Sequence, residues 1–203
     1  MHLEFLVEEP SAEAALQHIV PRITGHQHEA HFRVYQGKQD LLKRLPDRLR
    51  AYRQWILQNR RIVVLVDEDR QDCTQIKSDL EHIARQAGFS TQSAPNAASQ
   101  FQVLNRVAVE ELEAWFFGDI EALATAYPRV PRTLSTRRRF RNPDAISGGT
   151  WEQLERVLNK AGYYRAGMPK IEVASRIARH MDPARNRSTS FNTFVRGLRA
   201  LIA

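Results

Sequence analysis

The sequence predicts an α/β fold with a mainly parallel sheet of about four strands flanked by helices. Short apolar segments of strand length alternate with longer segments in which apolar residues recur every three or four positions. One short segment, residues 61–66 (RIVVLV), is apolar almost throughout, which is typical of a central parallel strand covered on both faces. The 203 residues and 42% hydrophobic composition suffice for a sizeable core.

The first two strands are each followed by a helix. Residues 2–7 (HLEFLV) alternate weakly and predict a strand, and residues 10–23 begin with proline and have helical apolar spacing. Residues 30–36 (AHFRVYQ) predict a second strand. The long amphipathic segment of residues 38–60 predicts a helix with a break or kink at Pro46.

The third and fourth strands continue this alternation. After the central strand, a helix is expected from about Gln71 to Ala87, with Gly88 ending it. Residues 101–109 (FQVLNRVAV) predict the fourth strand, and the next segment, 110–127, predicts a helix or a pair of helices.

Charge divides the chain into two parts. Residues 1–128 hold 14 Lys and Arg against 18 Asp and Glu, whereas residues 129–203 hold 16 against 5. We therefore expect an α/β core over 1–128 and a basic C-terminal extension over 129–203, packed on the core, with helices near 151–161, 169–180 and 190–202. A basic surface beside an acidic pocket suits a polyanion, although a solubilising surface explains the charge equally well.

Neither a membrane span nor a signal peptide is visible in the sequence, so we expect a cytoplasmic protein with no membrane partner. The single cysteine, Cys73, cannot form an internal disulfide, which agrees with a reducing compartment.

Acidic residues follow three of the predicted strands. Glu8 follows the first, Asp67 and Asp69 follow the third, and Glu111 and Glu113 follow the fourth. The carboxyl ends of parallel strands share one edge of the sheet, where ligands of such folds bind. Carboxylate oxygens are the ligands that Mg²⁺ prefers, so the sequence predicts a site for Mg²⁺ or Mn²⁺ there.

Not every acidic residue in these segments needs a metal to explain it. In extended geometry Asp67 and Asp69 lie on one side of the strand, and Glu68 points to the other. Asp72 and Asp119 are expected to cap the helices that follow them, and a turn or a cap could also explain Asp69.

Three motifs resemble one family. The segments FLVEEPSAEAAL, VVLVDEDRQDC and VAVEELEAWFFGD, with the ending MDPARNRSTSFNTFVRGL, resemble the TOPRIM-like domain-of-unknown-function 4276 (DUF4276) family. They are more distantly similar to the TOPRIM domain of the overcoming-lysogenization-defect nucleases. The usual first TOPRIM motif has glycine after its glutamate, and this chain has Glu9 there.

The resemblance carries specific expectations. It implies a TOPRIM-like, Rossmann-like fold, with Glu8 as the motif glutamate and Asp67 and Asp69 as metal ligands. It also implies Mg²⁺-dependent phosphodiester chemistry, association with an AAA-type or SMC-like ATPase, and a part in phage defence or nucleic-acid processing.

Basic residues supply further candidates. The segment TRRRFR surrounds one aromatic residue with four arginines, a composition that suits phosphate contact and base stacking, although a solvated loop explains it as well. The candidate nucleic-acid-binding residues are Arg137, Arg138, Arg139, Phe140 and Arg141. Lys170 is a candidate catalytic residue that would stabilise the transition state. The segment HQHEAH has histidines but no regular ligand spacing, so we do not predict a zinc site from it.

These observations favour a metal-dependent nuclease, or a nuclease subunit, acting on DNA or RNA. The alternative is a non-catalytic module that binds nucleic acid or nucleotide and regulates an ATPase. A primase-like activity ranks lower because no nucleotide-recognition motif is legible, and no tyrosine stands in a topoisomerase context.

Overall fold

Four parallel strands form one sheet in the order β2–β1–β3–β4. They are β1 (His2–Val7), β2 (Glu29–Val34), β3 (Arg60–Asp67) and β4 (Val103–Ala108). The computed structural model describes residues 1–55, 59–68 and 71–203. The predicted α/β class with a parallel sheet is confirmed, and the arrangement is Rossmann-like.

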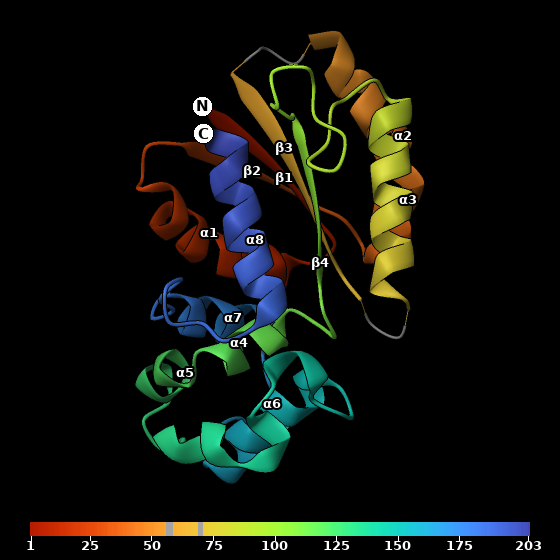
Figure 1. Cartoon of the computed structure of the whole chain (residues 1–203). Helices are drawn as coiled ribbons and strands as arrows, with labels where there is room; N and C mark the ends of the chain where they lie inside the picture. Colours follow the sequence, from red (N-terminus) through yellow and green to blue (C-terminus); the bar gives the residue numbers. More distant parts are fainter. Residues whose placement is uncertain (56–58, 69–70) are drawn as a thin grey trace.

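Helices cover both faces of the sheet (Figure 1). Helices α1 (Pro10–Thr24) and α8 (Thr189–Ile202) pack on one face, and α2 (Lys38–Trp55) and α3 (Cys73–Gln86) on the other. Each pair of helices forms a hydrophobic core with the sheet, and strand β3 contributes to both cores. Val63 and Leu65 pack in the core with α1 and α8, whereas Ile62, Val64 and Val66 pack in the core with α2 and α3. This double burial explains why the strand is apolar at consecutive positions.

Helix α2 runs through Pro46 as one helix, so of the break or kink predicted there the break does not occur, and the kink stays a prediction. A proline inside a helix costs about 3 kcal/mol. Leu41, Leu45 and Leu49 are fully buried on one side of the helix. Their burial stabilises the helix by roughly 2 kcal/mol each and outweighs the cost of the proline.

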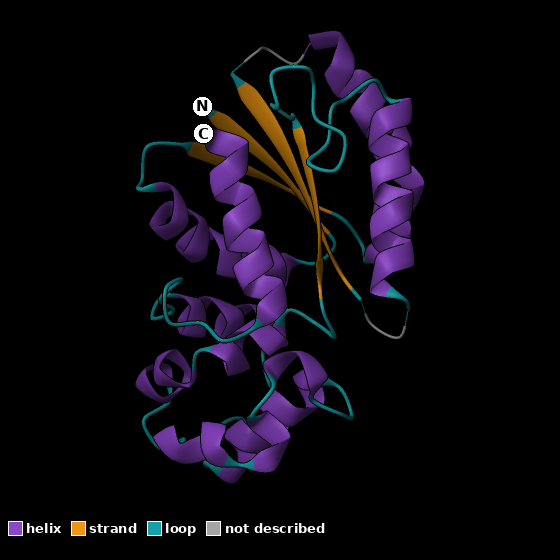
Figure 2. Cartoon of the chain, viewed as in Figure 1, coloured by secondary structure: helices purple, strands orange, loops and turns teal. Residues whose placement is uncertain are grey.

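The region beyond the carboxyl ends of the strands is helical (Figure 2). It contains α4 (Glu113–Gly118), α5 (Ile120–Ala126), α6 (Thr150–Lys160) and α7 (Lys170–Ala178), with short 3₁₀ turns between α5 and α6. The predicted helix pair is confirmed. Asp119 lies at the α4–α5 junction and accepts a hydrogen bond from the Ala122 N–H (3.1 Å), as expected of a cap. Its carboxylate also pairs with the Arg185 guanidinium at 2.8 and 2.9 Å.

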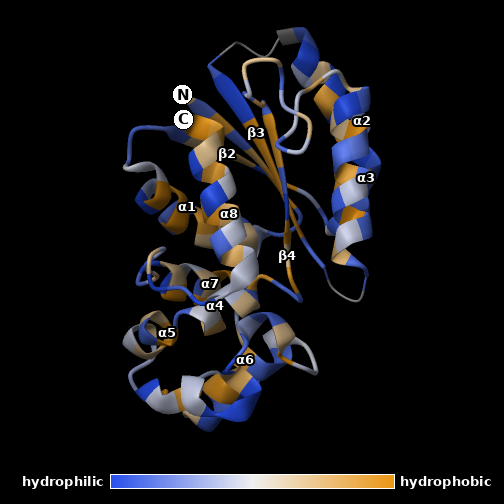
Figure 3. Cartoon of the chain, viewed as in Figure 1, coloured by the Kyte–Doolittle hydropathy of each residue, from blue (hydrophilic) through white to orange (hydrophobic). Residues whose placement is uncertain are grey.

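The C-terminal region completes the main core rather than forming a second one. Phe191 and Phe194 of α8 pack against the Trp115 ring, each with ring centroids 5.1 Å apart. The Ser188 hydroxyl accepts a hydrogen bond from the Phe191 N–H (3.1 Å) and caps α8. Figure 3 shows hydrophobic residues along much of the sheet and alternating hydrophilic and hydrophobic residues along α2 and α3.

Within the part of the chain that the structure describes, none of the helices combines the length and the apolar composition that a membrane-spanning segment needs.

Candidate functional site

Two neighbouring strands end in buried carboxylates. Val7, the last residue of β1, pairs with Leu65 of β3. Glu8 follows Val7, and Asp67 is the last residue of β3, so both side chains lie at the same edge of the sheet. The Asp67 N–H donates a hydrogen bond to Glu8 Oε1 (3.2 Å). Only 6% of Glu8 and 8% of Asp67 is exposed, so both carboxylates lie in a region of low solvent access.

Glu9 adds a third carboxylate. It occupies the position before the first residue of α1, where its backbone is extended, and its side chain turns toward the strand ends. One oxygen each from Glu8, Glu9 and Asp67 lies within 4.8 Å of the other two. We call these three residues the carboxylate cluster.

The cluster is electrostatically strained. Burial raises the pKa of Asp67 well above its ordinary value, and the charges of Glu8, Glu113 and Glu9 raise it further. A hydrogen bond from the backbone of Leu112 opposes these effects. Carboxylates held this close favour either a proton or a cation between them.

Glu113 lies behind the cluster, at the start of α4. It is 2% exposed, and burial raises its pKa to about 7, against the opposing effect of Lys170. Among the described residues it is outside the group whose oxygens lie within 4.8 Å of one another, so it acts on Asp67 through its charge. The expectation that Glu113 is a direct metal ligand stays a prediction.

Two lysines border the cluster. The Lys170 ammonium, at the start of α7, lies 3.0 and 3.2 Å from the two Glu9 carboxylate oxygens and 4.9 Å from the centre of the Trp151 ring. Lys38, at the start of α2, donates hydrogen bonds to the carbonyl oxygens of Asp67 (2.8 Å) and Glu68 (3.0 Å). Lys170 was predicted as a site residue, and the structure brings it to the cluster.

A cavity of about 470 Å³ opens beside the cluster. Glu8 and Glu9 form one side of it, and Lys38 with the preceding turn, residues 35–37, forms the other. A ligand in this cavity would therefore lie beside two acidic residues and one lysine.

The remaining acidic candidates have other positions. Asp69 lies outside the described residues. Glu68 points away from the cluster, as predicted, and its Oε2 accepts a hydrogen bond from the Glu110 N–H (2.9 Å). Glu111 was predicted as a metal ligand, but its Oε2 instead accepts hydrogen bonds from Thr150 Oγ1 and the Trp151 N–H, both at 2.8 Å. Glu111 therefore holds the first turn of α6, where negative charge complements the helix dipole.

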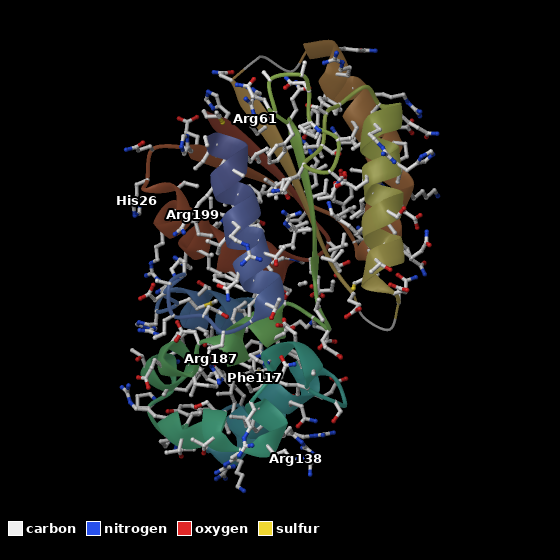
Figure 4. The ribbon with its side chains drawn as sticks, viewed as in Figure 1. His26, Arg61, Phe117, Arg138, Arg187 and Arg199 are labelled. Carbon is white, nitrogen blue, oxygen red and sulfur yellow. The ribbon has the colours of Figure 1, made fainter. Side chains whose placement is uncertain are left out.

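The arginine-rich segment also needs a correction. Phe140 is only 6% exposed, and its ring stacks on Phe117 with centroids 5.0 Å apart, so it is a core residue and cannot stack on a base. The four arginines around it are exposed at the surface: Arg137, Arg138, Arg139 and Arg141. Figure 4 shows Arg138 pointing outward at the end of the helical region opposite to the sheet. The segment is a surface of its own and does not border the strand ends.

Sequence reasoning missed Glu9 and Lys38. In the sequence Glu9 stood out only as a departure from the TOPRIM motif, although its position directly after Glu8 was a signal. A residue next to a strand end can turn back to the same edge when it precedes a helix. The sequence around Lys38 did not indicate a site residue. Its ammonium group contacts the end of β3 only because the strand order places α2 next to that strand.

The site has the chemistry of an oxygen-donor metal centre or of an acid–base centre at the carboxyl edge of a parallel sheet. The family model of DUF4276, a domain of unknown function, matches residues 7–199. The chain therefore belongs to the DUF4276 family, as the motifs predicted. None of the curated proteins and none of the solved structures gives a significant match.

Proposed function

We propose that this chain is a Mg²⁺- or Mn²⁺-dependent nuclease, or a nuclease subunit, that cleaves phosphodiester bonds in DNA or RNA. The observation that carries the proposal is the carboxylate cluster at the carboxyl edge of the sheet, flanked by two lysines and open to a cavity. Such sheets bind their ligands at this edge.

The residues present fit a hard divalent cation. The cluster offers only oxygen donors, which Mg²⁺ and Mn²⁺ prefer, and the ion commonly uses one or two carboxylates and completes its shell with water and phosphate. Burial raises the pKa of Asp67, and the neighbouring carboxylates raise it further; a cation would relieve the repulsion among these carboxylates. Asp67 and Glu9 would hold the ion, and Glu8 beside them would act as the base. When bound, it supplies charge neutralisation for the phosphate and a water molecule that loses its proton more easily.

The protein's own groups would position the substrate and move protons. Glu8 is placed to take a proton from the attacking water, because its carboxylate is fixed by the Asp67 N–H and borders the cavity. Lys170 would leave Glu9 for a phosphate oxygen and stabilise the charge that develops there. The Trp151 ring beside its ammonium limits the directions in which Lys170 can move.

The broader role rests on the resemblance stated above. The TOPRIM-like character and the similarity to overcoming-lysogenization-defect nucleases support an ATPase partner of the AAA or SMC-like type, and a part in phage defence or nucleic-acid processing. The exposed arginines of residues 137–141 would contact the nucleic-acid backbone away from the reaction centre.

The test is a cleavage assay on single- and double-stranded DNA and RNA with Mg²⁺ or Mn²⁺, comparing the wild type with Asp67→Asn and Glu8→Gln. The matched control is Glu13→Gln, which makes the same chemical change in the first turn of α1, outside the cluster. We expect both cluster variants to lose at least about 100-fold in rate and the control to keep the wild-type rate.

Two outcomes would overturn the proposal in different ways. Cleavage that survives in both cluster variants would refute the site. Absence of cleavage by the wild type, with and without its ATPase partner, together with retained binding of nucleic acid, would make the chain a binding or regulatory module.

A further inference from the structure

Three side chains meet at the opposite, amino edge of the sheet. His2 begins β1, and it is paired in register with Glu29, which begins β2. His31 lies two residues after Glu29, and alternate residues of a strand point to the same face. The strand register therefore brings two imidazoles and one carboxylate to one place, although the histidines are 29 positions apart in sequence.

The distances between these groups suit a shared ligand. Glu29 Oε2 lies 2.8 Å from His2 Nδ1 and 3.9 Å from His31 Nε2. All three potential ligand atoms lie within 4.8 Å of one another. Ligand atoms in tetrahedral zinc sites are about 3.4 Å apart, since each lies about 2.1 Å from the ion. The two observed distances bracket that value, so small side-chain rotations would complete the geometry.

We propose that His2, Glu29 and His31 form a second metal site, for a transition-metal ion such as Zn²⁺. Two nitrogen donors and one oxygen donor favour such an ion over Mg²⁺. Three protein ligands leave a position for water or another ligand, as in open zinc sites. The side chains are 34%, 69% and 57% exposed for His2, Glu29 and His31, so an ion can enter from solvent.

An ordinary ion pair explains less of the arrangement. An ion pair with Glu29 needs only the His2 imidazole. Here the His31 imidazole also stacks beside the His2 ring, with ring centroids 6.3 Å apart and planes at 26°. The next acidic residue on this face of β1, Glu4, binds Arg60 at 3.0 Å and is therefore engaged elsewhere. One carboxylate oxygen thus faces two imidazole nitrogens, which is a ligand arrangement.

This site is independent of the carboxylate cluster. β1 runs from His2 to Val7, and Glu8 follows, so the two sites lie about 20 Å apart at opposite ends of one strand. The donor sets also differ, because one site has only oxygen donors and the other has two imidazoles. Each site can therefore be removed without altering the other.

The experiment measures Zn²⁺ binding to the full chain without a histidine tag, by isothermal titration calorimetry in excess Mg²⁺. We expect one Zn²⁺ per chain, with Kd raised more than about tenfold in His2→Ala and in His31→Ala. The matched control is His26→Ala: Figure 4 shows His26 at the outer edge of the molecule, in the turn after α1. His26→Ala and Asp67→Asn should bind Zn²⁺ as the wild type does.

Co²⁺ substitution gives a second readout, since its visible absorption reports imidazole ligation and a tetrahedral shell. Circular dichroism of the metal-free variants checks that they fold. Wild-type affinity in the correctly folded His2→Ala and His31→Ala variants would overturn the proposal. So would loss of Zn²⁺ binding in Asp67→Asn, or a wild type that binds no Zn²⁺.

Discussion

Replacing Asp67 with asparagine should stabilise the metal-free protein while it abolishes binding of Mg²⁺. Asp67 faces Glu8 and Glu9 with oxygens no more than 4.8 Å apart. Two unit charges at that distance repel by about 3.5 kcal/mol at an effective dielectric constant of about 20. Uptake of a proton relieves part of this energy, as the raised pKa of Asp67 implies. We therefore expect a net gain of about 1 to 2 kcal/mol in the free energy of unfolding.

The substitution preserves shape and the hydrogen bond from the Leu112 backbone, because asparagine keeps an acceptor oxygen. The assay is urea unfolding at neutral pH, once with EDTA and once with millimolar Mg²⁺. Asp47→Asn is the matched control, since Asp47 is 82% exposed and pairs with Arg50 in the same helix turn. Its effect should stay within about 0.5 kcal/mol.

Two results would refute this reasoning. A loss of stability in EDTA for Asp67→Asn would mean that the carboxylates do not repel one another in the folded protein. An equal Mg²⁺-dependent shift of the unfolding midpoint in the wild type and in Asp67→Asn would mean that the ion binds elsewhere.

Four further substitutions test other parts of the structure. Desolvation raises the pKa of Glu81, but hydrogen bonds from Lys77, Ser93, Thr91 and Asn105 outweigh it and lower the pKa to about 2. Because the folded-state pKa is depressed, Glu81 stabilises the protein above about pH 4.5, and this contribution disappears as the pH falls toward 2. Glu81→Gln should lower the free energy of unfolding by about 2 kcal/mol at neutral pH. This is less than the full pKa shift implies, because the Lys77 ammonium is partly exposed. Urea unfolding at stepwise lower pH should show the difference in stability between the wild type and the variant becoming smaller. Phe140→Ala should cost about 3 to 4 kcal/mol in the same assay, whereas Arg138→Ala should leave stability unchanged and weaken binding of nucleic acid. Ser188→Ala should cost about 1 kcal/mol through loss of the α8 cap, measured by thermal unfolding.

Local sequence patterns predicted the sheet because each strand carries its own signal. The apolar segment of β3 and the start and stop residues of α1 and α3 act over a few positions, so their boundaries were predicted to within a few residues. The sequence could not decide between a break and a kink at Pro46, because the cost of the proline is local, whereas the compensating burial of the α2 leucines depends on packing against the sheet.

The site was predictable in part for the same reason. Glu8 and Asp67 follow strand ends, and parallel strands place their ends at one edge. Glu111 and Phe140 could not be assigned correctly from sequence, because their partners, Thr150 and Phe117, are distant in the chain. The sequence did not predict the His2–Glu29–His31 group either, because only the pairing of β1 with β2 brings its members together.

The acidic and basic parts of the chain, before and after residue 128, differ in surface charge but are not packed as separate cores. The basic residues after 128 are mostly exposed, while the apolar residues between them continue the core that contains α1 and β1. Helix α7 packs on α1 and brings Lys170 to Glu9, and Trp115 donates a hydrogen bond to Ser190 of the last helix at 2.9 Å. The basic C-terminal region therefore shares one hydrophobic core with α1 and β1. A polyanion at the carboxylate cluster would meet a cation supplied by the last third of the chain, so the proposed activity requires that region as much as it requires the sheet.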